Sequence, residues 1–266
     1  MTRVIAVTNQ KGGVGKTTSS ISLAAELALL GQRTLLIDID PQSSATSGLS
    51  IQPNEPGNDF YDMFFGRAPL ESLIKPSNIP NLDVVPSSKD LVGVEIELGK
   101  APGRELILKS ELARFQSAYD YILMDCPPSS GLLTLNALGA ADSIIIPLQA
   151  EYYALEGLSA LMGTVEFVRQ TFNQKLEILG VFLTMYDHRT NLSAQVLAEA
   201  KGYFKELMFD ILIPRNIKIS ESPSHGIPIC QYDKDSAGAK AYHRLALELD
   251  VRCKTNFNDT LRVGNG

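Results

Sequence analysis

Residues 9–18 read NQKGGVGKTT, a glycine-rich stretch that contains two lysines, Lys11 and Lys16. An apolar, β-rich run over residues 3–9 leads into it, and apolar residues recur at helical spacing over residues 17–30 behind it. Glycines let the backbone fold closely around phosphate oxygens, and the N-terminus of the following helix adds a favourable dipole. Strand, loop and helix in this order predict a phosphate-binding loop more strongly than an ordinary glycine turn.

The rest of the chain repeats this alternation of strand and helix. Gly31 ends the first helix, and residues 33–40 then form a run that is too apolar for burial on one face only, as parallel strands require. Further strands are expected at 82–86, 119–125, 143–148, 176–184 and 209–213, with helices near 104–118, 155–173, 192–205 and 236–250. We therefore predict an α/β fold, a P-loop NTPase whose mostly parallel twisted sheet is flanked by helices on both faces.

Length and composition predict a single-domain cytoplasmic protein. The 266 residues are 44% hydrophobic, so we expect one ATPase domain over residues 1–254 and a polar C-terminal tail at 255–266. The net charge of −6 argues against a generally basic protein that coats nucleic acid, although a local basic patch is compatible with it. Three scattered cysteines predict no disulfide framework, and no apolar run approaches the roughly 18 residues of a membrane span.

The loop residues have distinct expected roles. Lys16 would reach the β- and γ-phosphates of a nucleotide, and the hydroxyl of Thr17 would bind Mg²⁺. The residues predicted to contact ATP here are Lys11, Gly12, Gly13, Val14, Gly15, Lys16, Thr17 and Thr18. Lys11 is surplus to the usual phosphate-loop pattern, which accepts any residue at that position.

Three aspartates end apolar strands, and they are Asp38, Asp40 and Asp125. A hard cation beside a triphosphate prefers carboxylates or the waters they bind, so Asp40 and Asp125 join Thr17 as predicted magnesium residues. Asp125 would act through a bound water, unless it only caps a turn. Asp40 or, equally, Asp38 would orient or deprotonate the attacking water. Residues 127–131 are either a switch that senses the γ-phosphate or a rigid connection.

Six motifs carry a resemblance to a known family. In chain order they are KGGVGKTT (11–18), LLIDIDPQ (35–42), YILMDCPPSSGLLTLNAL (121–138), EYYALEGL (151–158), TMYDHRTNL (184–192) and IPRNIKISESPSHGIPI (213–229). The chain resembles the ParA/Soj partition ATPases, within the deviant-Walker class that also includes MinD, from about residue 3 to about residue 250. Because the first strand begins at once, we expect the short form, without the N-terminal helix-turn-helix domain of longer plasmid versions.

The resemblance implies a role for each matched residue. Lys11 corresponds to the signature lysine, Lys16 to the P-loop lysine, Thr17 to the magnesium hydroxyl, Asp40 to the water-positioning aspartate and Asp125 to the Walker B aspartate. Lys11, Lys16 and Asp40 are thus the expected catalytic residues. Pro214, Arg215 and Asn216 would lie beside the adenine, and Arg189 and Lys218 resemble the family's nonspecific DNA contacts. Without the resemblance, Arg189 is most simply a solvated loop charge.

The resemblance also implies a mechanism and partners. We expect a homodimer, formed with ATP and Mg²⁺, that binds double-stranded DNA nonspecifically and becomes nucleoid-associated in that state. A ParB-type DNA-binding protein would stimulate its slow ATP hydrolysis, and the cycle would segregate chromosome or plasmid DNA. Lys16 would serve the nucleotide of its own subunit, while Lys11 could reach across a two-fold interface to the nucleotide of the partner.

Two positions depart from the family pattern. Ser43-Ser44 stands where the family usually has Gly-Asn, within a polar loop that we expect at residues 41–58. Lys218 stands where arginine is common, which keeps the attraction for phosphate but loses the bidentate geometry of a guanidinium group. Nonspecific DNA binding needs only the attraction.

Two other classes of function compete with this interpretation. A MinD-like membrane or positioning ATPase needs a C-terminal amphipathic helix with a basic face, whereas residues 245–251 are acidic and short. The second competing class is a metabolic P-loop enzyme. It would be a small-molecule kinase, a small-molecule synthetase or an iron–sulfur ATPase. The iron–sulfur form needs paired cysteines, and only Cys126 lies near the expected site. No sequence feature identifies an acceptor-substrate pocket for a kinase. A ParA-like protein that positions protein cargo also remains open.

Overall fold

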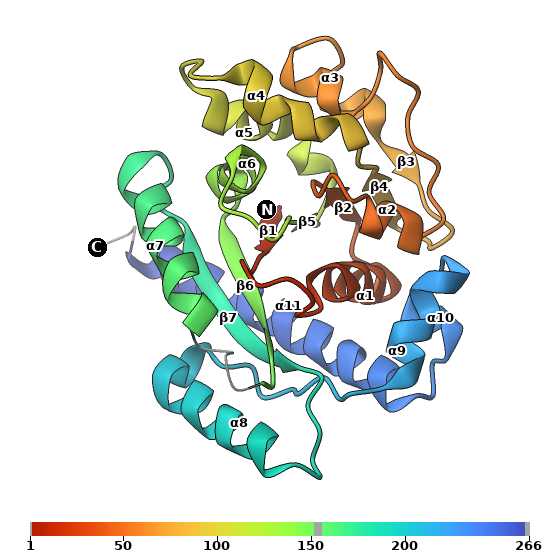
Figure 1. The fold of residues 1–266 in the computed structure, drawn as a ribbon, viewed down its shortest axis with the longest axis vertical. Coiled ribbons are helices and arrows are strands. Elements are labelled where there is room, and N and C mark those ends of the chain that lie inside the picture. The colour runs from red at the N-terminus through yellow and green to blue at the C-terminus, as the bar shows by residue number, and fades with distance from the viewer. Residues whose placement is uncertain (1, 152–155, 264–266) are drawn as a thin grey trace.

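A seven-stranded sheet forms the centre of the molecule (Figure 1), in a computed structural model that describes residues 2–151 and 156–263. The strand order is β3-β4-β2-β5-β1-β6-β7, and every neighbouring pair is parallel except β3 with β4. The strands are β1 Arg3–Val7, β2 Thr34–Asp38, β3 Lys75–Pro76, β4 Leu82–Val85, β5 Tyr121–Asp125, β6 Ser143–Gln149 and β7 Glu177–Thr184. The predicted mostly parallel sheet is confirmed, and the short antiparallel β3 was not predicted.

Helices cover both faces of the sheet, as predicted. They are α1 Lys16–Leu29, α2 Ser44–Gly48, α3 Phe60–Phe64, α4 Val94–Leu98, α5 Ile107–Leu112, α6 Leu132–Ala140, α7 Glu156–Thr171, α8 Asn191–Phe204, α9 Ile217–Glu221, α10 Ile229–Tyr232 and α11 Ala237–Val263. Helices α1 and α11 bury one apolar cluster against the sheet, and α5, α6, α7 and α8 contribute to the other. Alternate residues of β1 enter different clusters, because successive side chains of a strand point to opposite faces.

One predicted strand is wrong. Residues 209–213 run along the outer edge of β7, where Phe209 N–H donates to Val181 O (2.8 Å) and Ile213 N–H donates to Leu183 O (2.9 Å). They form no continuous ladder, because the segment advances four residues between these two bonds while β7 advances only two. Glu248 accepts from Asp210 N–H (3.2 Å), and Arg252 donates to the carbonyl of Met208 (2.5 Å).

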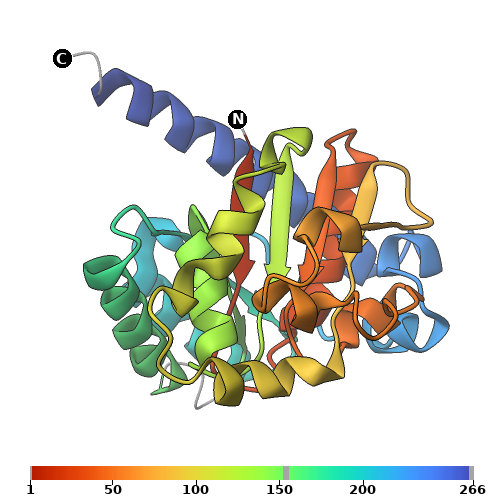
Figure 2. The ribbon, with the colours of Figure 1, turned by 90° about the horizontal axis from the view of Figure 1, so that it is seen from above.

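Two predicted helices differ in length from those observed. Residues 104–118 contain only α5 flanked by short 3₁₀ turns, because Asn136 intercepts the first helical bond. Its Oδ1 accepts from Leu108 N–H (3.1 Å) and its Nδ2 donates to Arg104 O (2.9 Å), the two groups that would otherwise pair. Helix α11 continues to Val263, well past the predicted end at 250, and its last turns project from the body (Figure 2). None of the helices that the structure describes has the length and apolar character needed to cross a membrane.

Candidate functional site

The glycine-rich loop connects β1 to α1 at the carboxyl edge of the sheet (Figure 1). Gly13 and Gly15 have φ angles of 75° and 87°, in the left-handed region that glycine adopts most readily, and Gly15 is the N-cap of α1. Side-chain hydrogen bonds between the loop and the neighbouring strands hold it in place. Asn9 Nδ2 donates to Pro147 O (2.8 Å), and Thr184 Oγ1 donates to Val14 O (2.8 Å). Tertiary contacts to β6 and β7 therefore fix the shape of the loop.

Lys16 is the first residue of α1, and it is buried beneath the loop with 7% of its surface exposed. Its Nζ donates to the backbone carbonyl of Lys11 across the loop (3.0 Å). Burial lowers the pKa of Lys16, while the nearby negative charge of Asp125 opposes that change. The ammonium group therefore lies inside the glycine-rich loop, where a phosphate can replace the carbonyl as its partner.

The carboxylates of β2 and β5 lie next to each other, since Asp38 and Asp125 are register partners on adjacent strands. Asp125 is fully buried. Its Oδ1 accepts from Ser20 Oγ (2.9 Å), and its Oδ2 has no hydrogen-bond partner among the described residues. Burial raises the pKa of both carboxyls, and the charge of Asp38 raises that of Asp125 further. An unpartnered buried carboxylate oxygen at this place fits a water molecule held by a magnesium ion.

Asp38 and Asp40 have different environments, although the residues alone left their roles equal. Asp38 Oδ2 accepts from both the backbone N–H and the hydroxyl of Thr46 (2.7 Å each), so its carboxylate fixes α2 against the sheet. Asp40 uses Oδ1 to accept from Gln42 N–H (2.9 Å) and lines the pocket above the loop. Asp40 is therefore the better placed of the two to meet a ligand.

A pocket of about 350 Å³ brings these elements together. Its lining residues are Gly12, Gly13, Gly15, Lys16, Thr17, Thr18, Ile21, Asp40, Ser44, Pro128, Met185 and Pro223. Most of the predicted loop residues thus share one pocket with Asp40 and with Pro128 of the segment 127–131. Val14 instead buries its side chain in the protein. In the described part of the chain, no group of three or more His, Cys, Asp or Glu could hold a metal alone. A magnesium ion bound here would therefore need ligands from a nucleotide or from water.

A second pocket, of about 480 Å³, adjoins the first through Gly15, Thr18, Met185 and Pro223. Its remaining lining residues are Thr184, Ile213, Pro214, Arg215, Asn216, Ile217, Ile219, Ser220 and Tyr242. The predicted adenine residues 214–216 are therefore beside the phosphate pocket, against a largely apolar wall that suits a flat ring. Met185 and Tyr242 were missed from the sequence. Met185 follows β7 directly, so its place at the carboxyl edge was a usable signal, whereas Tyr242 belongs to a helix far away in the chain.

The Lys11 side chain lines neither of these two pockets. Its Nζ pairs with Glu151 Oε2 of the same chain (3.4 Å), and both side chains are partly exposed. Lys11 does not line the phosphate pocket formed by the described residues. Next to it, Gln10 Nε2 donates to Ser130 Oγ (2.7 Å) and to Thr164 Oγ1 (2.9 Å). The entrance of the loop is thus joined to the segment 127–131 and to α7, while the Lys11 ammonium pairs with Glu151 and lines neither pocket.

Comparison with known proteins identifies the family. The AAA domain model matches residues 2–178. The chain is 52% identical to the sporulation initiation inhibitor protein Soj of Bacillus subtilis, over 94% of this chain and 98% of that protein. It is 49% identical to the chromosome partitioning protein ParA of Myxococcus xanthus, over 94% of this chain and 88% of that protein. The chain belongs to the ParA/Soj family.

A solved structure with a bound nucleotide is similar to this ParA/Soj family member. The structure of cobyrinic acid a,c-diamide synthase from Mycobacterium smegmatis, with bound ADP and magnesium, has a TM-score of 0.84 and 35% sequence identity. The alignment covers 96% of this chain and 97% of that one. That structure contains ADP and magnesium in the same fold.

The departure from the ParA/Soj pattern at Ser43-Ser44 has a structural consequence. Ser43 caps α2 with a φ of 55°, in the left-handed region that serine seldom occupies. Ser47 Oγ donates to Ser43 O (2.9 Å), and Ser43 N–H donates to Asp40 O (2.9 Å). The segment predicted as a polar loop at 41–58 thus contains a short helix, and Ser44 lines the phosphate pocket.

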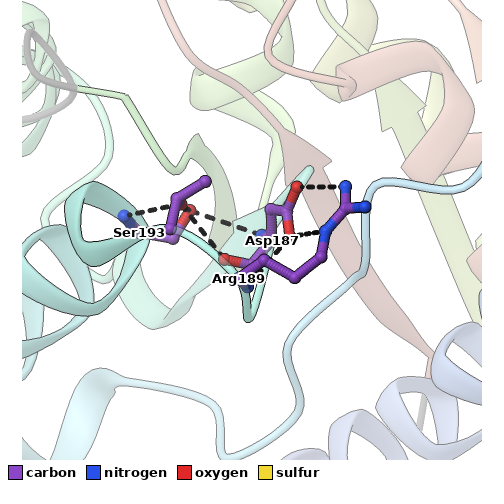
Figure 3. A network of polar contacts seen from close by, with 4 residues as sticks. Asp187, Arg189 and Ser193 are labelled. Atoms are coloured by element: carbon purple, nitrogen blue, oxygen red, sulfur yellow. Dashed lines mark hydrogen bonds and ion pairs between the residues drawn. The ribbon is translucent and has the colours of Figure 1, made fainter.

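The two residues expected to contact DNA in this ParA/Soj family member are both ion-paired, with Arg189 exposed and Lys218 half-buried. Arg189 lies in the loop before α8, where its guanidinium forms two bonds with the carboxylate of Asp187 (2.9 and 2.7 Å; Figure 3). Lys218 lies in α9, and its Nζ pairs with Glu221 Oε2 (2.9 Å). Neither residue lines the pockets described above. The motif at 151–158 falls partly outside the described residues, so four of its positions have no structural account.

Proposed function

We propose that this protein is an ATP-dependent dimerisation switch that partitions DNA. It would load ATP and Mg²⁺, pair with a second copy, bind double-stranded DNA without sequence preference and then hydrolyse ATP to release it. The name of the relative in Myxococcus xanthus, a chromosome partitioning protein, supports the partitioning role. The ADP and magnesium bound to the synthase of the same fold support the choice of cofactors.

Each residue of the pocket suits one part of this ligand. Lys16 and the backbone N–H groups of the loop would bind the phosphates, and the apolar wall beside residues 214–216 would hold the base. Thr17 would bind the metal directly, and Asp125 would hold one of its waters. A bound magnesium ion supplies neutralisation of the charge that develops on the phosphates. Asp40 would orient the attacking water, because phosphoryl transfer is catalysed mainly by positioning and charge stabilisation.

The observation that carries the proposal of a dimer is the position of Lys11. Its ammonium pairs with Glu151 through an ion pair whose members are both partly exposed, while Lys16 occupies the phosphate pocket of its own chain. Exposed ion pairs are weak, so a terminal phosphate of the partner's nucleotide could replace the Glu151 carboxylate. ATP would then join the two copies, and its hydrolysis would separate them.

The oligomeric state tests this step. Lys11→Ala should keep ATP binding but lose the dimer that wild type forms with ATP, as measured by size-exclusion chromatography with light scattering. Lys175→Ala is the matched control, since Lys175 is exposed just before β7, at the amino edge of the sheet, and has no ion pair within the described residues. A normal ATP-dependent dimer of Lys11→Ala would contradict the role of Lys11 across the interface.

The proposed partners are DNA and a ParB-type protein. Arg189 and Lys218 would meet phosphates without reading bases, so Arg189→Glu should weaken binding equally for duplexes of any sequence. The stimulating partner would act through a short basic N-terminal segment. Adding that segment as a synthetic peptide should accelerate ATP turnover in the presence of DNA. Turnover that does not respond to any ParB-type partner would remove this part of the proposal.

A further inference from the structure

The two cations of the proposed DNA surface are each held by a carboxylate of the same chain. The guanidinium of Arg189 meets Asp187 side-on, with Nε to Oδ1 at 2.9 Å and Nη2 to Oδ2 at 2.7 Å (Figure 3). This is the bidentate geometry with which arginine also binds phosphate. The edge of Arg189 that best fits a DNA phosphate is therefore occupied, although 86% of its side chain is exposed.

Lys218 is likewise paired with a carboxylate of its own chain, that of Glu221. Lys218 Nζ donates to Glu221 Oε2 (2.9 Å), and the same oxygen accepts from Tyr232 OH (2.9 Å). The ammonium also lies 5.5 Å from the centre of the Tyr232 ring. Glu221 is thus fixed from two directions, and Lys218 is held against it.

The two pairs lie on segments that are bonded to each other. Tyr186, next to Asp187, accepts from Arg215 N–H (2.9 Å), and Arg215 lies three residues before Lys218. The carboxylate of Asp187 is itself placed precisely, because its Oδ1 also accepts from the backbone N–H of Arg189 (3.0 Å). Arg189 holds the pKa of Asp187 well below its usual range, so this carboxylate stays ionised at neutral pH.

We propose that Asp187 and Glu221 are intramolecular competitors of DNA, which set the affinity and salt dependence of the surface formed by Arg189 and Lys218. This inference rests on the proposed binding of DNA. A phosphate must displace each carboxylate before it takes the cation, and the displaced carboxylate must then recruit a cation from solution. Each exchange therefore releases fewer counterions in total than an unpaired Arg or Lys would release.

Conservative variants test the competition without changing the loop. Asp187→Asn keeps Oδ1 as acceptor for Arg189 N–H, and Glu221→Gln keeps an oxygen for Tyr232 OH, but each removes the negative charge. Binding to a random-sequence duplex, measured by fluorescence anisotropy with ATP present, should tighten about two- to fivefold for each variant, as expected from the strength of exposed ion pairs. The slope of log affinity against log salt should also become steeper.

Two controls separate competition from a general change in charge. Glu199→Gln removes the same charge from α8. Glu199 is exposed and forms no ion pair in the part of the chain that the structure describes. This variant should therefore change the affinity for DNA less than Asp187→Asn does. The gain from Asp187→Asn should disappear in an Arg189→Ala background, since no cation is left to release. ATP turnover without DNA should stay unchanged in the Asp187 and Glu221 variants.

The possible results also separate this inference from the proposed function. If Arg189→Ala weakens DNA binding but Asp187→Asn and Glu221→Gln bind no tighter than Glu199→Gln, DNA is bound and the competition is wrong. If Arg189→Ala and Lys218→Ala both bind DNA as wild type does, the assignment of the DNA surface is itself wrong. An Asp187→Asn gain that persists in the Arg189→Ala background would also contradict competition at Arg189.

Discussion

Lys16 donates from Nζ to the backbone carbonyl of Lys11, 3.0 Å away across the glycine-rich loop. The two lysines of one short motif are therefore connected, although Lys16 lines the phosphate pocket and the Lys11 side chain pairs with Glu151. A phosphate that takes the same N–H of Lys16 would free the Lys11 carbonyl. Nucleotide binding would thus loosen the backbone of the residue that we propose to meet the partner's nucleotide.

Lys16→Gln should weaken nucleotide binding by about 10- to 100-fold, because one charge-assisted hydrogen bond contributes about 1.5–3 kcal/mol. It should leave the free energy of unfolding unchanged or higher without nucleotide, since burial of the Lys16 charge is unfavourable. Titration of a fluorescent ATP analogue and urea unfolding measure the two effects. Lys175→Gln serves as control, and equal nucleotide affinity of the two variants would contradict the role of Lys16.

Asp40→Ala should lower ATP turnover at least about 100-fold, as expected for loss of a group that positions or deprotonates water. The ATP-bound dimer should then persist, as light scattering would detect. Asp40→Asn keeps an oxygen that can accept from Gln42 N–H and isolates the effect of charge from that of loop structure. Undiminished turnover of Asp40→Ala would exclude Asp40 from catalysis. Asp38 would then be the remaining candidate to orient the attacking water.

Asp125→Asn should stabilise the nucleotide-free protein at pH 7 by on the order of 1–2 kcal/mol while it weakens magnesium-dependent nucleotide binding. The folded state raises the pKa of Asp125, so the folded protein binds more protons than the unfolded chain from about pH 4 up to that raised pKa. Wild-type stability therefore declines as the pH rises through that range, and the variant should show a flatter profile. Thermal unfolding at several pH values checks this, and an identical pH profile of the two proteins would contradict it.

Ser43→Gly should raise the free energy of unfolding by about 0.5–1 kcal/mol, because glycine adopts the left-handed conformation of this residue without the steric cost that serine pays. Ser47→Gly is a control of opposite sign, since Ser47 lies within α2 and glycine destabilises helix interiors by about 1 kcal/mol. Denaturant unfolding compares the two variants. Destabilisation by Ser43→Gly would mean that its loop is not strained.

Local patterns predicted the central parts of this protein well. The glycine loop between an apolar strand and a periodic helix was enough to predict the P-loop, and the apolar runs before Asp38 and Asp125 predicted buried parallel strands. The errors arose where distant parts of the chain determine the backbone hydrogen bonds. Asn136 breaks the helix predicted at 104–118, and the segment 209–213 bonds to β7 only at its two ends, out of regular register.

Residue types and spacing alone therefore account for the phosphate loop, the sheet and the family, because backbone geometry and burial depend on nearby residues. They left Asp38 and Asp40 equal, and they predicted no intramolecular partner for Lys11, Arg189 or Lys218. Packing gave Asp38 and Asp40 different environments, because Thr46 donates to the carboxylate of Asp38 whereas Asp40 lines the pocket. It also brought Glu151, Asp187 and Glu221 within reach of the three cations. Ion pairing depends on distances of a few ångströms between side chains, and only the folded chain sets those distances.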